Sequence, residues 1–368
     1  MMKEKILAII GAGFAAVPII EKAHELGLKV LAFARQQSYA QEIVDFFIEE
    51  NDFDVEFMAC KCREFEVDGI MATSEITTEV AAHLAAVLNL PGNSIKGGFA
   101  GKNKFEMRKR VASVNSICQP HFELYQEGKE YSLPIIVKSV DSCGKRGVSL
   151  VKREEDFEDA LITARDNSSD GSVLIEEYLE GGKEYSIECL SIEQIHQIVQ
   201  YTEKDSSGPP HFVELGHHQP ANLSNEIKER INLAVSEVLD VLGLTCGMAH
   251  LELKIINDEL YFIEVGARGG GDHISDILTP LSTGFDYIKA AVLCAMGDYI
   301  PQEICHKSFS GIYFHCKQNE YLKSLFEEAK VSDWCVKNTI KENEYIEVSG
   351  NVEASNSGYF IYCSDHKI

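Results

Sequence analysis

The chain has 368 residues, 45% of them hydrophobic, which is long enough for two or three domains with cores of their own. Its formal net charge of -24 argues against nucleic acid and membrane surfaces as partners, because an acidic surface repels phosphates and anionic headgroups. The apolar runs are shorter than the roughly 20 residues of a membrane helix, no signal-peptide pattern is present, and the 11 cysteines contain no CxxC pair, so we expect a cytoplasmic protein with reduced thiols.

The first hundred residues alternate between strand and helix patterns, which indicates a parallel sheet. Strands are expected at residues 5–10, 29–33 and 68–72, and helices at 15–26 and 77–89. Leu90-Pro91-Gly92 ends the last of these helices. We place the end of the first domain at residue 100.

A glycine turn, Gly11-Ala12-Gly13, follows the first strand and resembles half of a dinucleotide-binding fingerprint. An NAD site also requires an acidic residue after the second strand to bind a ribose hydroxyl, and Phe33-Ala34-Arg35 offers none. Tight packing of the following helix, or contact with an acceptor substrate, explains the turn equally well.

Residues 102–110 predict a basic helix, and the pattern after it becomes rich in strands. Strands are expected at residues 134–139, 147–152, 172–178, 184–191, 248–255 and 259–265. Between them we expect a long polar loop over residues 205–223 and an amphipathic helix over residues 225–242 that Gly243 ends. This order fits a mostly antiparallel α+β domain, followed after residue 297 by a small β-rich module.

The expected hairpin at residues 248–265 carries the richest chemical pattern. His250, Glu252 and Lys254 alternate on its first strand, so their side chains point the same way. Pairing of the two strands brings Glu252 close to Glu264. Two close carboxylates repel unless a cation lies between them, and oxygen ligands suit Mg²⁺ that bridges nucleotide phosphates. The alternative is the solvent-exposed face of an ordinary hairpin.

Cationic positions elsewhere suit a transferring phosphoryl group. Arg268, after the hairpin, could stabilise charge on that group, and Lys138 ends an apolar strand as a fixed charge. The loop after Lys138 contains Ser142, Gly144 and Gly147, and such a loop can bring backbone N–H groups over phosphates. The alternatives are a surface arginine and a plain turn with solvated cations.

Two further segments suggest contacts with ligands. Glu176-Glu177-Tyr178-Leu179 indicates an interdomain hinge whose backbone could pair with adenine, and Glu184 could then hold the ribose hydroxyls. His211, His217 and His218 lie in the expected polar loop with Glu214, but they lack a firm spacing for zinc ligands, so we prefer a loop that covers the substrate.

Taken in chain order, these pieces resemble the ATP-grasp superfamily. The motifs that carry the resemblance are Asn103-Lys104-Phe105-Glu106-Met107-Arg108, Lys138, Ser142 to Val148, Glu176 to Leu179, Glu184, Gly208 to His217, His250-Leu251-Glu252 and Phe262 to Arg268. The similarity is greatest to the carboxylate–amine ligases of the superfamily, which include L-amino-acid ligases and carbamoyl-phosphate-synthase-like and biotin-carboxylase-like proteins. It covers nearly the whole chain, and the order and spacing of the motifs carry it.

The resemblance implies an α/β and α+β fold with three parts. These are a Rossmann-like domain over residues 1–100, a two-part ATP-grasp domain over residues 101–300 with a small lid over 115–180, and a C-terminal β-rich module over 301–368. It also implies ATP and Mg²⁺, with Mn²⁺ as an alternative ion, and small-molecule carboxylate and amine substrates. Homodimers are frequent in the family.

The resemblance also implies roles for individual residues. The nucleotide contacts are Lys104, Lys138, Ser142, Gly144, Gly147, Glu176, Glu177, Tyr178, Leu179 and Glu184; the metal ligands are Glu252 and Glu264; the catalytic residues are Arg268 and Lys138; and the substrate contacts are His250, Gly270, Gly271, His273, Glu214 and His217. Gly266 departs from the family pattern, because many members have there an asparagine that helps to hold a second metal.

The expected reaction is phosphorylation of a carboxylate by ATP and transfer of the acyl group to an amine, with release of ADP and phosphate. One alternative is a purine-biosynthesis or carboxylase-type enzyme that uses bicarbonate or a phosphorylated amine. Another is a non-catalytic ATP-binding protein, and an oxidoreductase based on the glycine turn is the third.

Overall fold

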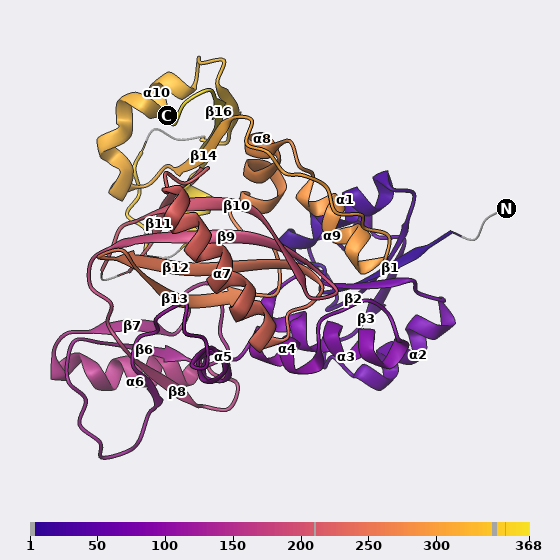
Figure 1. The fold of residues 1–368 in the computed structure, drawn as a ribbon, viewed down its shortest axis with the longest axis horizontal. Helices are drawn as coiled ribbons and strands as arrows, with labels where there is room; N and C mark the ends of the chain where they lie inside the picture. Colours follow the sequence, from indigo (N-terminus) through magenta and orange to yellow (C-terminus); the bar gives the residue numbers. More distant parts are fainter. Residues whose placement is uncertain (1–3, 210, 341–343, 350) are drawn as a thin grey trace.

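The computed structural model describes residues 4–209, 211–340, 344–349 and 351–368, which form three β-sheets (Figure 1). The first sheet is parallel, with the strand order β3-β2-β1-β4. The strands and helices of this first part of the chain are β1 (Ile6–Ile10), α1 (Val17–Glu25), β2 (Lys29–Ala34), β3 (Phe46–Glu49), α2 (Val55–Glu64), β4 (Gly69–Ala72), α3 (Thr78–Leu88) and α4 (Ile95–Ala100). Every residue of β1 is buried, as expected for a parallel strand covered on both faces. The predicted βαβ start is confirmed, whereas β3 and α2 were not anticipated.

The glycine turn after β1 is shaped by packing. Gly11 has a φ of +97°, and a Cβ atom there would lie 2.5 Å from Oγ1 of Thr73, which follows the neighbouring strand β4. Only glycine tolerates both the positive φ and this close approach. Tight packing therefore accounts for Gly11 without a dinucleotide.

The second sheet is small and antiparallel, with the strand order β5-β8-β6-β7. It comprises β5 (Phe122–Leu124), β6 (Ile135–Ser139), β7 (Val148–Val151) and β8 (Val173–Glu177), with helix α6 (Phe157–Asp166) packed against it; helix α5 (Lys104–Val111) precedes it. Val137, Leu161 and Ile175 belong to a separate small core under α6. This sheet and its helix, at the lower left of Figure 1, lie within residues 115–180, where the resemblance predicts a small lid.

The third sheet has eight strands in the order β13-β12-β9-β10-β11-β14-β16-β15. They are β9 (Lys183–Ile192), β10 (Ile195–Ser206), β11 (Glu214–Gln219), β12 (Gly247–Ile256), β13 (Glu259–Gly266), β14 (Phe309–Phe314), β15 (Cys335–Asn338) and β16 (Tyr359–Ser364). All the pairings within it are antiparallel. The expected hairpin is present as β12 and β13.

Helices cover this large sheet. Helix α7 (Asn225–Leu242) packs its apolar stripe onto β9, β12 and β13, and Gly243 ends it in the left-handed conformation with a φ of 77°, as predicted. The remaining helices are α8 (Thr279–Thr283), α9 (Tyr287–Ala295), α10 (Lys323–Ala329) and α11 (Asn351–Ser357), and Ile274–Leu278 forms a π-helical turn before α8. Within the described part of the chain, none of the helices is both long and apolar enough to cross a bilayer.

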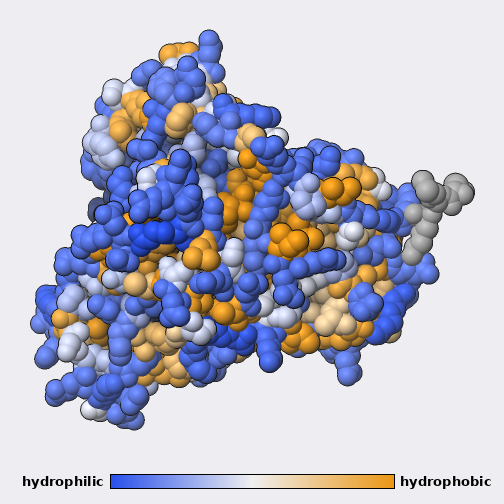
Figure 2. All heavy atoms as spheres, viewed as in Figure 1, coloured by the Kyte–Doolittle hydropathy of each residue, from blue (hydrophilic) through white to orange (hydrophobic). Residues whose placement is uncertain are grey.

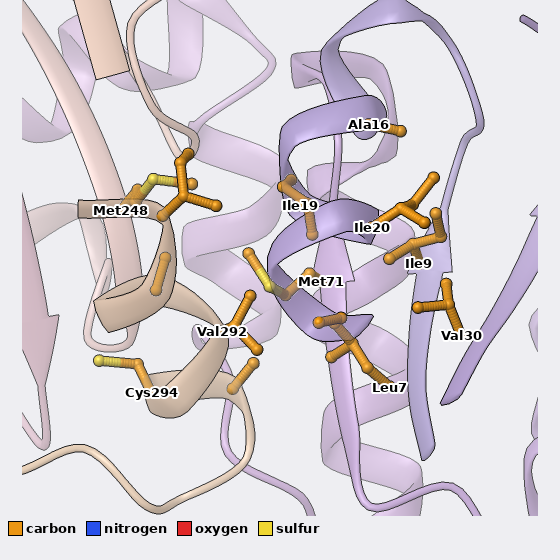
Figure 3. Close-up of a cluster of buried hydrophobic side chains, with 14 of the residues drawn as sticks. Leu7, Ile9, Ala16, Ile19, Ile20, Val30, Met71, Met248, Val292 and Cys294 are labelled. Atoms are coloured by element: carbon orange, nitrogen blue, oxygen red, sulfur yellow. The ribbon is translucent and has the colours of Figure 1, made fainter. Parts of the chain in front are cut away.

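A large core joins the first domain to the large sheet. Helix α9 lies against α1, and Figure 3 shows Val292 of α9 and Met248 of β12 facing Ile19 and Leu7 of the first domain. Because these side chains belong to one buried cluster, the parallel sheet has a fixed position relative to the hairpin of β12 and β13. The face seen in Figure 2 is mostly hydrophilic, in agreement with the acidic composition, and apolar side chains gather near its middle.

The prediction of a long polar loop over residues 205–223 is wrong. Strand β10 runs to Ser206, and all residues of β11 are buried; Pro210, in the short connection, lies outside the described residues. The polar side chains of β11 are neutralised by partners rather than by water, since His218 pairs with Asp205 and His217 with Glu214. Because its charged side chains are paired within the protein, β11 can be buried although its sequence is as polar as that of a loop.

The strands after residue 300 do not stand apart from the rest. Strand β14 pairs with β11, and β16 and β15 continue from it, so the large sheet runs across the expected boundary between residues 300 and 301. The three domain limits drawn from the sequence stay a prediction.

Candidate functional site

A cavity lies between the small sheet and the hairpin of β12 and β13. Most of the residues to which the sequence assigned nucleotide and metal contacts line it: Lys104, Lys138, Ser142, Gly144, Glu176, Glu177, Tyr178, Leu179, Glu184, Glu252 and Glu264. Gly147 is not among the lining residues. Its φ is +69°, and a Cβ atom there would lie 2.8 Å from Cβ of Asn167, so it contributes to the shape of the loop rather than to the cavity wall. The structure thus gathers these residues from five strands, one helix and two loops at one place.

The two predicted metal ligands are direct neighbours. Glu252 on β12 pairs in register with Glu264 on β13, as the sequence predicted. Lys204 Nζ lies 2.5 Å from Oε1 of Glu252, and Lys104 Nζ lies 3.8 Å from Oε2 of Glu264. Burial alone would raise the pKa of Glu252, but the Lys204 and His250 charges hold that pKa well below its usual range. Two neighbouring carboxylates at a cavity wall form an oxygen ligand set that fits Mg²⁺.

A buried ion triad forms the floor of the cavity. Arg108 donates from Nε and Nη2 to the two carboxylate oxygens of Glu176, at 2.7 and 3.2 Å, and Lys138 Nζ lies 2.6 Å from Oε2 of the same residue. Burial alone would raise the pKa of Glu176, but the two cations lower it to about 2. Arg108 and Lys138 thus face a single carboxylate at the floor, and burial lowers the pKa of Lys138 from its usual value. A bound phosphate would give this lysine a second anionic partner.

The connection from β8 to β9 forms the other side of the cavity. Lys254 Nζ donates to the backbone oxygen of Leu179 at 2.8 Å, which fixes the predicted hinge against β12. The ring of Tyr178 lies 6.2 Å from that of Phe212. Gly181 and Gly182 both have positive φ and let the chain cross from one sheet to the other.

The loop between β6 and β7 reaches across the cavity. Lys104 Nζ donates to the backbone oxygen of Ser142, and Gly144 has open space around its Cα and a φ of +63°. Lys145 Nζ donates to the oxygen of Phe212 at 2.5 Å and lies 3.1 Å from Oε1 of Glu214. The loop is therefore anchored on both sides and exposes small residues between its anchors.

Arg268 lies in a smaller pocket next to the cavity. It shares this pocket with Glu75, His250 and Glu264, while Lys104 and Ser142 line both hollows. Arg268 Nε donates to Oε1 of Glu75 at 2.7 Å, so the first domain supplies one wall through the turn after β4. Burial alone would raise the pKa of Glu75, but Arg268 lowers it and keeps the pair ionised.

The expected substrate contacts divide into two groups. Glu214 and His217 lie with Asp272 in a buried cluster whose ligand atoms are all within 4.8 Å of one another, and Nε2 of His217 is 3.0 Å from Glu214. Burial alone would lower the pKa of His217, but Asp272 and Glu214 raise it. His273 is already engaged, with Nδ1 2.9 Å from Asp276 and Nε2 2.7 Å from the Tyr359 hydroxyl.

The glycine run after β13 is only partly open. Gly270 donates its N–H to Oε2 of Glu188 at 3.0 Å, so this amide is occupied within the protein, in contrast to the expectation that it grips a substrate. Gly271 has open space around its Cα. Gly266 ends β13, and a Cβ atom there would lie 3.4 Å from Cγ of Arg268, so position 266 borders the arginine side chain.

Several residues at the site were given no role by the sequence reasoning, although Arg108 and Lys145 lie within motifs that carry the resemblance. They are Glu75, Arg108, Lys145, Glu188, Lys204 and Asp272. Glu188 carries a usable signal, because it is a charged residue between the apolar Ile187 and Cys189 of an expected strand. Lys204 carries none, since the charged residues Glu203 and Asp205 flank it. Glu75 and Asp272 carry none, since each stands in a polar turn where an acidic residue is ordinary.

Comparisons with known proteins match most of this arrangement. The family model described as ATP-grasp N-terminal domain matches residues 20–92, and the one described as ATP-grasp domain matches residues 131–276. The crystal structure of L-amino acid ligase from Bacillus licheniformis is similar with a TM-score of 0.81 and 24% identity, and covers 100% of this chain and 95% of that chain.

Curated relatives are similarly distant in sequence. Pyruvate carboxylase of Staphylococcus aureus is 27% identical over 190 residues, which are 50% of this chain and 16% of the relative. The formate-dependent phosphoribosylglycinamide formyltransferase of Prochlorococcus marinus is 23% identical over 330 residues, which are 83% of this chain and 80% of the relative. The chain thus spans a small part of the carboxylase but most of the formyltransferase.

Proposed function

Because the chain belongs to the ATP-grasp superfamily, we propose that it is a Mg-ATP-dependent ligase that joins a carboxylate to an amine through an acyl phosphate. The observation that carries this proposal is the cavity in which Lys104, Lys138 and the Glu252–Glu264 pair meet. Phosphoryl transfer needs little covalent help from a protein, and positioning with neutralisation of charge dominates it. These side chains supply both.

The nucleotide is assigned to the cavity between the two sheets. The backbone of Glu177 to Leu179 faces it and suits adenine, with Glu184 at the ribose. Lys138 is buried and fixed by Glu176, so it can meet phosphate oxygens without losing much side-chain freedom. The loop that holds Ser142 and Gly144 then covers the phosphates and excludes water.

Glu252 and Glu264 are assigned to Mg²⁺. A bound Mg²⁺ would neutralise charge on the phosphate oxygens and orient them. The residues fit this ion, because both carboxylates line the cavity side by side and Glu252 is held ionised. Lys204 and Lys104, which lie beside the two carboxylates, keep their charges close to balance when no ion is bound.

The proposed chemistry has two steps. An oxygen of the substrate carboxylate attacks the γ-phosphorus of ATP and ADP leaves, which forms the acyl phosphate. The amine nitrogen then attacks the carbonyl carbon and loses a proton, and phosphate leaves as the amide forms. Arg268 and Lys138 are assigned to stabilise the negative charge that develops in these steps. His250 lines the pocket of Arg268, where the carboxylate is expected, and Gly271 has open space around its Cα.

An amino acid is the proposed carboxylate substrate. Glu214, His217 and Asp272 form one cluster, in which Lys145 and Lys204 already pair with Glu214. The partly exposed Asp272 is therefore the carboxylate that we assign to the ammonium group of the substrate. Lys204 connects this cluster to the metal ligands, since its Nζ lies 3.1 Å from Glu214 and 2.5 Å from Glu252. The fold of an L-amino acid ligase, which this chain shares, supports the same assignment.

The test is phosphate release from Mg-ATP by the purified protein, with amino acids offered singly and in pairs and with ADP and AMP resolved. We expect ADP and phosphate to appear only with a carboxylate and an amine together. Turnover that depends on bicarbonate, or on a phosphorylated amine, would instead identify a carboxylase-type or purine-biosynthesis enzyme. Binding of ATP without phosphate release in any mixture would identify a nucleotide-binding protein.

A further inference from the structure

Glu188 is a buried carboxylate in the middle of β9, and its side chain has no exposure to solvent. A carboxylate is costly to bury unless several donors satisfy it. Glu188 has three such partners from three different segments. Oε1 contacts Nδ1 of His250 on β12, and Oε2 accepts the N–H of Gly270 at 3.0 Å and the Ser275 hydroxyl at 3.4 Å.

Two of these partners lead directly to the site. The other ring nitrogen of His250, Nε2, lies 3.3 Å from Oε1 of Glu252. The carbonyl oxygen of Gly269, the residue before Gly270, accepts Nη1 of Arg268 at 2.6 Å. One carboxylate therefore determines where an imidazole and, through the glycine turn, a guanidinium are held.

The atoms around the Glu188–His250 contact are closely packed. A Cβ atom at Gly270 would lie 2.8 Å from Nδ1 of His250 and 2.9 Å from both Oε1 of Glu188 and Cγ2 of Ile274. The backbone of the turn thus rests directly on the Glu188–His250 pair, and only glycine fits there. A shift of the carboxylate must move the turn as well.

We propose that Glu188 is a positioning residue for the ligase reaction, which sets His250 and Arg268 in the geometry that the transition state needs. This inference rests on the proposed function. Glu188 lines neither the nucleotide cavity nor the pocket of Arg268, so it acts through the groups it holds. A displacement of about 1 Å at such groups lowers turnover by roughly a hundredfold.

The experiment compares Glu188→Gln and Glu188→Ala with the matched control Glu203→Gln. Glu203 is also a buried carboxylate of the large sheet, but its partners are Lys183 and Lys367, away from the cavity. Three quantities are measured on each full-length protein: hydrogen exchange of the backbone over residues 266–275, affinity for Mg-ADP by calorimetry, and kcat and KM with the substrate pair found for the wild type. Glu188→Gln is the variant that keeps shape if Glu188→Ala fails to fold.

We expect faster exchange over residues 266–275 in both Glu188 variants, an affinity for Mg-ADP within about threefold of wild type, and a fall in kcat of roughly a hundredfold with little change in KM for ATP. The control should change none of these. Unchanged exchange in the turn, or a loss of ADP affinity as large as the loss of kcat, would overturn the inference. If the wild type shows no turnover with any substrate pair, the proposed function fails, while exchange and ADP affinity still decide whether Glu188 holds the turn.

Discussion

Lys204 on β10 lies with its Nζ 2.5 Å from Oε1 of Glu252 on β12, so a buried ammonium contacts the side chain that we assign to Mg²⁺. The same Nζ is 3.1 Å from Glu214. Burial alone would lower the pKa of Lys204, but the two carboxylates raise it well above its usual value, and the lysine stays charged. Lys204 thus reduces the repulsion between the carboxylates of Glu214 and Glu252 before any substrate binds.

Lys204→Met should destabilise the protein, because it leaves Glu214 and Glu252 without their shared cation. Removing one partner from a buried ion pair costs roughly 3–5 kcal/mol, and we expect about 3 kcal/mol here. Urea unfolding of both proteins measures the difference. Lys183→Met is the matched control, since Lys183 is exposed and its pairing with Glu203 is worth less than about 1 kcal/mol. Equal stability of the two variants would refute the role of Lys204.

Glu264→Gln should abolish turnover and leave nucleotide binding partly intact, because the metal site loses one charge while the cavity keeps its shape. Phosphate release and ADP affinity are measured in the same preparation over a range of Mg²⁺ concentrations. Wild-type-like turnover in this variant would contradict the assignment of Glu264 as a metal ligand. Removal of Mg²⁺ with a chelator should likewise abolish turnover of the wild type, and added Mg²⁺ should restore that turnover.

Lys138→Ala should mainly weaken ATP binding. Hydrogen bonds to charged groups contribute about 1.5–3 kcal/mol, which corresponds to a roughly tenfold to hundredfold loss of affinity. Calorimetry with ATP measures it. Lys129→Ala is a suitable control in the same subdomain, because Lys129 is paired with Glu123 and does not line the cavity. An affinity equal to that of the wild type would rule out the phosphate contact.

The triad of Arg108, Glu176 and Lys138 should make stability dependent on acid pH. The pKa of Glu176 is lowered from its usual value of 4.5 to about 2, so its ionised form contributes stability above pH 4.5 that is lost as the pH falls towards 2. The difference in unfolding free energy between the wild type and Glu176→Gln should therefore shrink over this window. Urea unfolding at several pH values measures it, and a difference that stays constant from pH 5 to pH 2.5 would contradict the assignment.

Much of the first domain and of the hairpin could be predicted from the sequence. Strand β1 follows from an unbroken apolar run that Gly11 ends. The pairing of Glu252 with Glu264 follows from period-two alternation and a short turn, which determine which residues face each other. The helix end at Gly243 likewise follows from the residue alone. Features that depend on a few adjacent residues were thus within reach of the sequence.

The missed features depend on contacts between distant segments. The Arg268–Glu75 pair joins residues 193 positions apart, and Glu188 meets Gly270 across 82 positions. In neither pair does the sequence around one residue indicate its partner. Strand β11 failed for a related reason, because its charges are neutralised by residues on β10 and by Asp272, which no local window contains.

Strand β11 also sets a condition on synthesis of the chain. Its outer edge pairs with β14, which begins at Phe309, so some ninety further residues must leave the ribosome before that edge is covered. An uncovered edge strand is open to pairing with other chains. Until β14 has been made, β11 depends on β10 alone for its backbone hydrogen bonds between strands. The middle of the large sheet is therefore completed only late in synthesis.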